Sequence, residues 1–485
     1  MRKQSGNSFE NSKIEIRNSG KIMAQTSTEK YNMMTKTTVP KLIIKLSIPT
    51  IISMLVTGLY NTADTFFVGR ISTDDTAAVG LVFAAMAIIQ AFGFLCGQGS
   101  GTYLSQKLGA GEKKEAEEMA ATGLLVSVIL GIILAVVGNI YARPIAYLLG
   151  ADELSIDKTI QYLRIILIGA PFMTSQFVIN NQLRFQGSAI YAMIGLFCGA
   201  VVNVGLDPLL IFGFHMGISG AAVATISAQF ISFIVLMIGT TRGSNIRLHP
   251  KNIRFSWKYI KGIINGGMAS LLRQGLAAVA TLLMNNVARE LGGNTAVAAM
   301  SVVTKLVMMI GCAMIGFGQG FQPVCSFNYG AGLKHRVREG FFFCVKYGTI
   351  FLTAASLVLI IFAGPLVYIM RPDPAVVAIG KVALRWQAAA LPFLAFSSMA
   401  NMLLQSTGKG VKASIASSCR SGLFFVPLLY LLTHFWGIKG LEVTQALADF
   451  CAFVVAIPLA VSELKTMKKS EPVIKEESGL NSIEE

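Results

Sequence analysis

The sequence predicts an all-α membrane protein that crosses the bilayer many times. Of its 485 residues, 53% are hydrophobic and only 14% are charged, whereas in a soluble protein of this length about a quarter would be charged. Many apolar runs reach about 20 residues, the length that an α-helix needs to span the hydrocarbon core. These runs lack a period-two alternation, so the strands of a membrane β-barrel are not expected.

Twelve helical spans account for the apolar runs. They are expected near residues 42–68, 77–104, 117–148, 158–182, 189–213 and 217–240 in the first half, and near 262–288, 296–325, 338–369, 376–406, 411–433 and 440–462 in the second. Proline removes a backbone donor and can bend a helix, and four prolines inside the spans are candidate bends. These prolines are Pro49, Pro171, Pro323 and Pro392.

Polar segments flank the spans and divide them. Residues 1–40 lack the apolar centre of a cleavable signal, so a disordered cytoplasmic tail is expected there, and another at 464–485. The basic segment 242–261 is the expected linker between a first lobe, 41–241, and a second lobe, 262–463. Fifteen Lys and Arg residues fall in the loops of one side and four in those of the other, which places both termini in the cytoplasm by the positive-inside rule.

The net charge of +16 resides mostly in these loops. Basic residues there set orientation and contact anionic lipid. Membrane lipid is therefore the expected partner of this charge, and nucleic acid is not.

The two halves of the chain repeat each other. The segment "GQGSGTYLSQKLGAGEKKEAEE" (97–118) aligns with "GQGFQPVCSFNYGAGLKHRVRE" (318–339) at an offset of 221, with nine identical positions. Each repeat holds six spans, an even number, so both halves insert the same way up. We therefore expect two six-helix bundles related by a pseudo-twofold axis along the membrane normal, with a central cavity between them.

Motifs for enzymatic chemistry or nucleotide binding are missing. The segment "STGKGVKAS" has Gly-Lys without the following hydroxyl residue that a phosphate loop needs. The four histidines show no ligand spacing, and the seven cysteines contain no Cys-x-x-Cys pair. We expect no enzyme activity and no cofactor, so transport would draw on an ion gradient or be passive.

Acidic residues inside the spans are the first candidates for function. Asp64 and Asp207 lie in the first half and Asp449 in the second. A carboxylate at the centre of a span costs about 2.5–3.5 kcal/mol on insertion scales, so it needs a partner. Asn203 precedes Asp207 by four residues and shares its helix face. Asp449 could serve either helix packing or a second proton site.

Further side chains fall on the faces that could surround the first two acids. They are Thr225 and the backbone carbonyl of Ala221 on the sixth span, Met54, Thr57 and Asn61 on the first, and Gln176 and Asn180 on the fourth. Carboxylate, amide and hydroxyl oxygens suit a monovalent cation such as Na+, and they equally suit a shared proton. Alternatively, these side chains hydrogen-bond neighbouring helices together, an interpretation favoured for Asn61, Gln176 and Gln98.

The chain resembles the multidrug and toxic compound extrusion (MATE) transporters, in particular the prokaryotic branch with its coupling acid on helix one. The resemblance covers about residues 40–465 and is carried by "LSIPTIISMLVTGLYNTADTFFVGR", the two "GQG…GAG" segments, "NNQLRFQGS", "NVGLDPLLIFG" and "GISGAAVATISAQ". It implies a V-shaped fold of two six-helix bundles. It also implies export of cationic or amphipathic drugs in exchange for Na+ or H+.

The resemblance also assigns roles to individual residues. Pro49 matches the bending proline of helix one, and Met54 matches a position lining the drug cavity. The matching ion-coupling cluster comprises Asp64, Asn180, Asn203, Asp207 and Thr225, of which Asp64, Asn203, Asp207 and Thr225 would hold Na+. The substrate cavity is expected around Met54, Thr57, Asn61 and Gln176. Some members carry acids on helices seven and ten instead, and this chain has none there.

The sequence thus predicts a monomeric drug antiporter of the plasma membrane whose partners are small cationic or amphipathic molecules and lipid. One alternative is a flippase or exporter of lipid-linked or other endogenous substrates on the same fold. Arg273 and Arg420 could begin the cationic cavity that such a protein needs. A channel or a membrane receptor is the second alternative.

Overall fold

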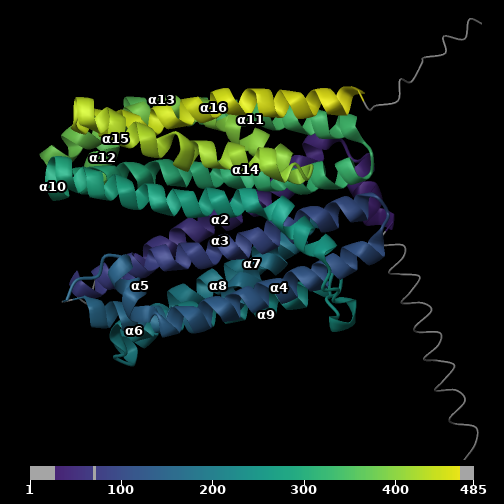
Figure 1. The fold of residues 1–485 in the computed structure, drawn as a ribbon, viewed down its shortest axis with the longest axis horizontal. Coiled ribbons are helices and arrows are strands. Elements are labelled where there is room, and N and C mark those ends of the chain that lie inside the picture. Colours follow the sequence, from purple (N-terminus) through teal and green to yellow (C-terminus); the bar gives the residue numbers. More distant parts are fainter. Residues whose placement is uncertain (1–27, 69–72, 154, 470–485) are drawn as a thin grey trace, which may run out of the picture.

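Long helices joined by short loops make up the computed structural model, which describes residues 28–68, 73–153 and 155–469 (Figure 1). The side chains of residues 59–66, 68, 73–74, 76–77 and 469 lie outside the described part. The masked side chains include two of the predicted site residues, Asn61 and Asp64, whose backbone lies in helix α2.

The first lobe contains eight helices after a short N-terminal helix, residues 28–36. They are α2 (Val39–Val68), α3 (Thr73–Gly109), α4 (Lys113–Ile140), α5 (Ala142–Leu148), α6 (Ile156–Ile168), α7 (Ala170–Phe185), α8 (Ala189–Pro208), which continues into the π-helical turn η1 (Leu209–Gly213), and α9 (Gly217–Thr240).

The second lobe follows a linker that contains the 3-10 turn η2 (Pro250–Asn252). Its helices are α10 (Trp257–Gly330), α11 (Lys334–Ile361), α12 (Ala363–Met370), α13 (Pro374–Ser406), α14 (Gly410–Ser418), the π-helical turn η3 (Cys419–Leu423), α15 (Phe425–Trp436) and α16 (Ile438–Lys469).

Twelve membrane spans fit the described residues. Ten helices are long and apolar enough to cross a membrane, and α6 with α7 forms one further span bent by 49°. Helix α10 contributes two spans, because its helical geometry breaks at Gly292 and at Gly293, which has φ +59°. The predicted fold class is confirmed. Pro171 lies at the start of α7, beside the α6–α7 bend, whereas α2 is helical on both sides of Pro49.

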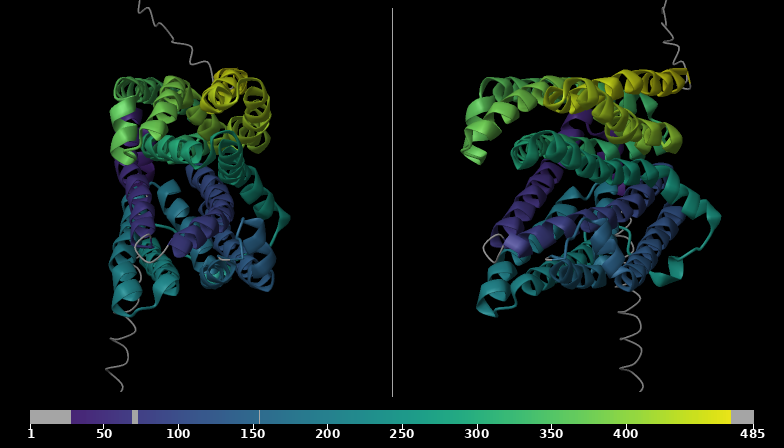
Figure 2. Two further views of the ribbon diagram at one scale, coloured as in Figure 1. Left: turned by 90° about the vertical axis from the view of Figure 1, so that its left-hand side faces the viewer. Right: turned by 60° about the vertical axis from the view of Figure 1, so that its left-hand side comes forward.

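The two lobes form two layers of helices that run in roughly the same direction. In Figure 1, α2 to α9 occupy the lower layer and α10 to α16 the upper one, and Figure 2 shows the same division from two other sides. Helices α2 and α3 of the first lobe contact α10 of the second. The seam between the lobes is therefore built from the paired helices α2–α10 and α3–α10.

The internal repeat reappears in the backbone. Three pairs of glycines with positive φ match between the halves: Gly111 with Gly332 and Gly187 with Gly408 at the offset of 221, and Gly217 with Gly437 at an offset of 220 later in the repeat. Hydrogen bonds repeat as well: Asn180 Nδ2 donates to Ala192 O at 2.9 Å, and Asn401 Nδ2 donates to Ala413 O at 2.8 Å. The two lobes are thus structural copies, as the offset of 221 predicts.

The seam is tight at one end of the molecule, where the linker 241–256 lies, and we call this the linker end. A Cβ atom at Gly320 would lie 2.5 Å from Ser47 Cα, and one at Gly316 would lie 2.6 Å from Ile51 Cα. Two turns farther along α2, a Cβ atom at Gly58 would first meet Cys312 Sγ, at 4.0 Å. Helices α2 and α10 therefore separate toward the other end, which we call the open end.

The predicted disordered tail needs a correction, because residues 28–36 are helical and the segment that follows them is held by tertiary contacts. Met34 is fully buried. Its carbonyl accepts a hydrogen bond from Asn328 Nδ2 at 3.1 Å, and the carbonyl of Thr37 accepts one from Arg336 Nη2 at 2.5 Å. These tertiary contacts order a segment whose composition alone predicts disorder.

Two predicted boundaries also shift by a few residues. Helix α10 begins at Trp257, so residues 257–261 of the expected linker are helical. Helix α16 continues to Lys469, six residues into the expected C-terminal tail. In both places charged side chains extend beyond the apolar span, and a helix can continue in them after its hydrophobic pattern ends.

Candidate ion-coupling site

The centre of the candidate site is a buried acid on α8. Asp207 has no exposed surface, and Asn203, one turn earlier, is 3% exposed. The amide Nδ2 of Asn203 lies 3.4 Å from Asp207 Oδ1, a long hydrogen bond on one helix face. The predicted pairing of these two residues is therefore present.

The neighbouring helix α9 brings its own oxygens to the same level. Helices α8 and α9 are antiparallel, because Gly195 faces Leu236, Gly199 faces Ser232, and Gly220 faces Leu210. Ser232 Oγ fixes this register by donating to Gly195 O at 2.9 Å. This register sets Asp207 level with residues 221–225 of α9. Ala221 and Thr225, at the two ends of that stretch, are both buried.

The backbone after Asp207 is irregular. Pro208 ends the α-helical hydrogen-bond pattern of α8 and is followed by the π-helical turn η1. Proline removes one donor, and π-helical turns occur frequently at functional sites. The sequence thus places a buried carboxylate beside a locally weakened stretch of helix.

The chemistry of this cluster favours a positive charge. Asn203 Oδ1 is buried and has no hydrogen-bond partner among the described residues. A buried acceptor without a donor is unfavourable by about 1–3 kcal/mol. Carboxylate, amide, hydroxyl and carbonyl oxygens together could coordinate Na+, and a proton on the carboxyl group could instead donate to the amide oxygen.

Asn180 makes a contact that the sequence did not predict. Its Nδ2 donates to Ala192 O, and Asn401 Nδ2 donates to Ala413 O at the equivalent place in the second lobe. Because the second lobe lacks an acid pair in its spans, this bond serves the packing of both lobes. The coupling role of Asn180 stays a prediction. It would depend on the amide oxygen Oδ1, because Nδ2 already donates to Ala192 O.

The helix-one residues are only partly described. The side chains of Asn61 and Asp64 lie outside the described part, so their distance from Asp207 is not given. Thr57 Oγ1 donates to Ser53 O at 2.8 Å within α2, and Met54 is half-buried. Gln176 on α7 is buried, and its Oε1 has no partner among the described residues.

The second lobe holds an ion pair that sequence reasoning missed. Arg420 Nε lies 2.7 Å from Asp449 Oδ1, and Gln445 Nε2 donates to the same oxygen at 2.9 Å. The two charged residues are 29 positions apart on different elements, so no local spacing signals their contact. The only sequence signal was the presence of both charges inside apolar spans.

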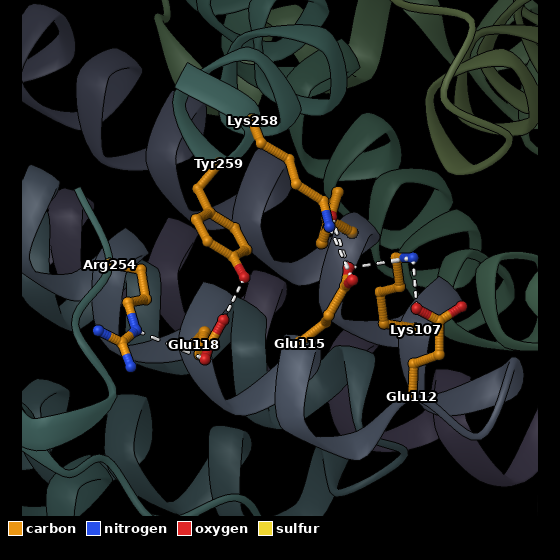
Figure 3. Close-up of polar contacts among 8 residues, drawn as sticks. Lys107, Glu112, Glu115, Glu118, Arg254, Lys258 and Tyr259 are labelled. Carbon is orange, nitrogen blue, oxygen red and sulfur yellow. Dashed lines mark hydrogen bonds and ion pairs between the residues drawn. The ribbon is translucent and has the colours of Figure 1, made fainter. Parts of the chain in front are cut away.

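The linker end is held shut by a network of charged and phenolic side chains (Figure 3). Lys258 of α10 contacts Glu115 of α4 at 2.7 Å, and Lys107 contacts the same carboxylate at 3.1 Å. Tyr259 donates to Glu118, which also lies 3.6 Å from Arg254 Nε. The network joins the second lobe and the linker to the first lobe on the side where the seam is tight.

Comparisons with known proteins give a consistent result. The MatE family model matches residues 49–209 and 269–431. The multidrug export protein MepA of Staphylococcus haemolyticus (strain JCSC1435) is 26% identical over 417 residues, which are 85% of this chain and 92% of that protein.

Solved structures of similar proteins share the fold. A multidrug resistance MATE family transporter of the MOP superfamily in an outward-facing conformation superposes with a TM-score of 0.84 at 25% identity, covering 90% of this chain and 98% of that one. A MATE structure in complex with MaL6 has a TM-score of 0.85 at 25% identity, covering 91% and 99%.

Proposed function

The chain belongs to the MatE family, and from this premise we propose that it exports cationic or amphipathic small molecules in exchange for Na+ or H+. It is a multi-pass membrane transporter for multidrug efflux and not an enzyme. The identity of the coupling ion, the residues that bind it and the orientation in the membrane belong to the proposal.

One observation supports the coupling mechanism: a fully buried carboxylate lies beside an amide oxygen that has no donor among the described side chains. Asp207 and Asn203 are both buried, and they share one face of α8. A buried carboxylate and a buried amide oxygen both require polar partners at such a position. A cation or a proton that enters this cluster would neutralise the carboxylate and satisfy the amide oxygen at the same time.

Coupling then follows from a difference in affinity between two conformations. In the proposed cycle, Na+ or H+ enters the cluster from outside and neutralises Asp207 together with Asp64. Helix α2 then repacks or bends near Pro49 and helps to expel the drug. The ion leaves on the cytoplasmic side. A ligand drives such a change only if it binds the two states with different affinity.

The linker end is assigned to the cytoplasm in this proposal. The N-terminal helix, the basic linker and the charged network of Figure 3 all lie at this end. The positive-inside rule favours that side for such basic loops. Drug contacts are proposed around Met54, Thr57, Asn61 and Gln176.

Efflux from proteoliposomes tests the proposal. Ethidium transport is measured under an imposed Na+ gradient or an imposed pH gradient, one at a time. We expect one of the two gradients to drive accumulation against the ethidium gradient, and Asp64→Asn to abolish it. Transport that proceeds equally after both gradients are collapsed would indicate a passive channel and contradict the proposal.

A further inference from the structure

The second lobe carries more positive charge at membrane depth than its acids balance. Arg273 lies near the middle of the first helical part of α10, and Arg420 lies in η3. Arg420 is paired with Asp449. Arg273 has no hydrogen bond and no ion pair with any other residue that the structure describes. A charged side chain at such depth is costly unless it meets water or a counter-charge.

Arg273 and Arg420 lie on neighbouring elements, because α10 packs against η3. Arg273 and Leu276 are three residues apart and therefore share one helix face. A Cβ atom at Gly422 of η3 would lie 2.9 Å from Leu276 Cδ1, so this face of α10 is directed at η3. The charge of Arg420 acts on Arg273, and the charge of Arg273 acts in turn on Arg184 of the first lobe.

The local charge balance follows from these neighbours. Arg184 is 2% exposed and donates to the neutral Asn181. Among the described side chains, these three guanidinium groups have one carboxylate partner, that of Asp449. Within that part of the chain, Arg273 is the member without a hydrogen bond or an ion pair.

The fold does not require these charges. At the repeat offset of 221, Arg273 corresponds to Ile52 and Arg420 to Gly199, and at the later offset of 220, Asp449 corresponds to Gln229. The first lobe packs the same positions with apolar or neutral residues. The first lobe instead carries the buried acid Asp207. At these matched positions the second lobe therefore carries charges that the first lobe lacks.

We propose that Arg273, with Arg420 held in place by Asp449, forms a subsite for the oxyanion group of an amphipathic ligand. This inference rests on the proposed export function and specifies its cargo further. A guanidinium group binds a carboxylate or phosphate through two parallel hydrogen bonds. A zwitterion with one carboxylate would thus be recognised where a simple cation would be repelled.

A matched pair of dyes separates this subsite from general affinity for aromatic cations. Rhodamine 110 carries a free carboxylate, and rhodamine 123 is its methyl ester. Binding of each is measured by fluorescence polarisation to the full chain in phosphatidylcholine nanodiscs. We expect Arg273→Gln to weaken rhodamine 110 binding about tenfold or more, because a charged hydrogen bond is lost. We expect rhodamine 123 binding to change by less than about twofold.

Two outcomes would overturn the inference: equal weakening of both dyes, or no change for rhodamine 110. Arg273→Lys is the matched variant that keeps the charge and loses the bidentate geometry. It should weaken rhodamine 110 less than Arg273→Gln does. If Arg273→Gln does not fold, the test rests on Arg273→Lys. The subsite is contradicted if this variant binds rhodamine 110 as tightly as the unchanged chain does.

The oxyanion could belong to cargo or to a lipid headgroup, and one titration distinguishes them. Increasing phosphatidylglycerol in the nanodiscs should weaken rhodamine 110 binding in the unchanged chain, but not in Arg273→Gln, if lipid phosphate occupies the subsite. Insensitivity to phosphatidylglycerol assigns it to the carboxylate of the cargo. These measurements need no gradient. A chain that prefers rhodamine 110 but transports nothing under either gradient therefore contradicts the proposed function and leaves the subsite intact.

Discussion

At the scale of single residues, the pair Asn203 and Asp207 shows how a charge is retained in a membrane helix. Both side chains are buried, yet the only hydrogen bond between them is long, at 3.4 Å. In the second lobe, Asn401 Nδ2 donates to Ala413 O and to Ser417 Oγ, while its Oδ1, like that of Asn203, has no partner among the described residues. In the proposed function, the Asn203 amide oxygen would be one of the ligands of the transported ion.

Asp207→Asn is expected to abolish gradient-driven ethidium efflux while leaving the protein folded. The asparagine amide has the size of the carboxylate but no charge. The cluster can therefore no longer bind or release Na+ or H+ at this position. Efflux from proteoliposomes and a thermal unfolding midpoint are the measurements. Asp75→Asn is the control, since Asp75 is a similarly buried acid outside the cluster, paired with Lys158 at 3.2 Å. Retained efflux in Asp207→Asn would exclude this acid from coupling.

At the scale of elements, the sequence predicted the helices well and their ends poorly. Apolar runs of span length determine the number of spans, and the break at Gly292 and Gly293 falls between two predicted spans. The repeat offset predicted that Gly111 and Gly332 would occupy matching positions, and both have positive φ.

The features that the sequence did not predict depend on contacts between residues that lie far apart in the chain. The N-terminal helix was missed because its order depends on Asn328 and Arg336, nearly 300 residues away. The Arg420–Asp449 pair was missed for the same reason. The Asn203–Asp207 pair was found because residues four apart on a helix share a face.

The N-terminal helix should respond to pH through Lys30. Its amine donates to Ser188 Oγ at 3.0 Å and to Asn245 Oδ1 at 2.7 Å, and burial lowers the pKa of Lys30 to about 7. A detached helix would titrate near 10.4. Between about pH 7 and pH 10.4, Lys30 of the detached helix therefore carries a proton more often than Lys30 of the docked helix. Docking is therefore strongest above about pH 10 and weakens as the pH falls toward 7.

Hydrogen exchange of residues 28–36 at pH 7 and pH 9.5, corrected for intrinsic rates, measures this docking. Protection should be higher at pH 9.5. The charged or ionisable neighbours Lys113, Glu117, Arg247 and His249 line the same pocket. Lys30→Met isolates the contribution of Lys30, and an unchanged pH dependence in that variant would assign the effect to those neighbours.

The seam between α3 and α10 should not tolerate even one added methyl group. A Cβ atom at Gly267 would lie 1.8 Å from Leu95 O, a backbone atom that no rotamer change can move. Overpacking of this kind costs about 1–3 kcal/mol. We expect Gly267→Ala to lower the thermal unfolding midpoint. Gly275→Ala on the same helix meets open space and should leave the midpoint unchanged or raise it, because alanine favours helix by up to about 1 kcal/mol.

At the scale of the whole molecule, two copies of one bundle meet along a seam that is tight at the linker end only. The contacts across it are partly reciprocal, since a Cβ atom at Gly109 would meet Phe327 O and one at Gly330 would meet Gln106 O, each at 2.0 Å. The Lys258–Glu115 ion pair crosses the same end. Alternating access requires these contacts to break during transport.

Linking the two lobes at this end should stop transport. In a background lacking the half-buried Cys198, Cys312 and Cys451, the pair Glu115→Cys and Lys258→Cys is joined by a short bis-maleimide. We expect efflux to cease, because the linker end can no longer open.

A matched control uses two positions within the first lobe. Lys107 and Glu112 also form an ion pair, at 2.8 Å, and neither belongs to the second lobe. The pair Lys107→Cys and Glu112→Cys, joined by the same reagent, should leave efflux intact. Full activity in the linked Glu115–Lys258 pair would show that the ends of the lobes need not separate there.

Because the seam is tight at the linker end only, a small rotation of one lobe there produces a larger displacement at the open end. From Gly267, where the lobes touch, to the end of the first helical part of α10 is 24 residues, or about 36 Å at 1.5 Å per residue. A rotation of about 10° around the touching glycines would move the far tips by about 6 Å over that arm. A displacement of that size would open or close a gap wide enough for a flat aromatic molecule.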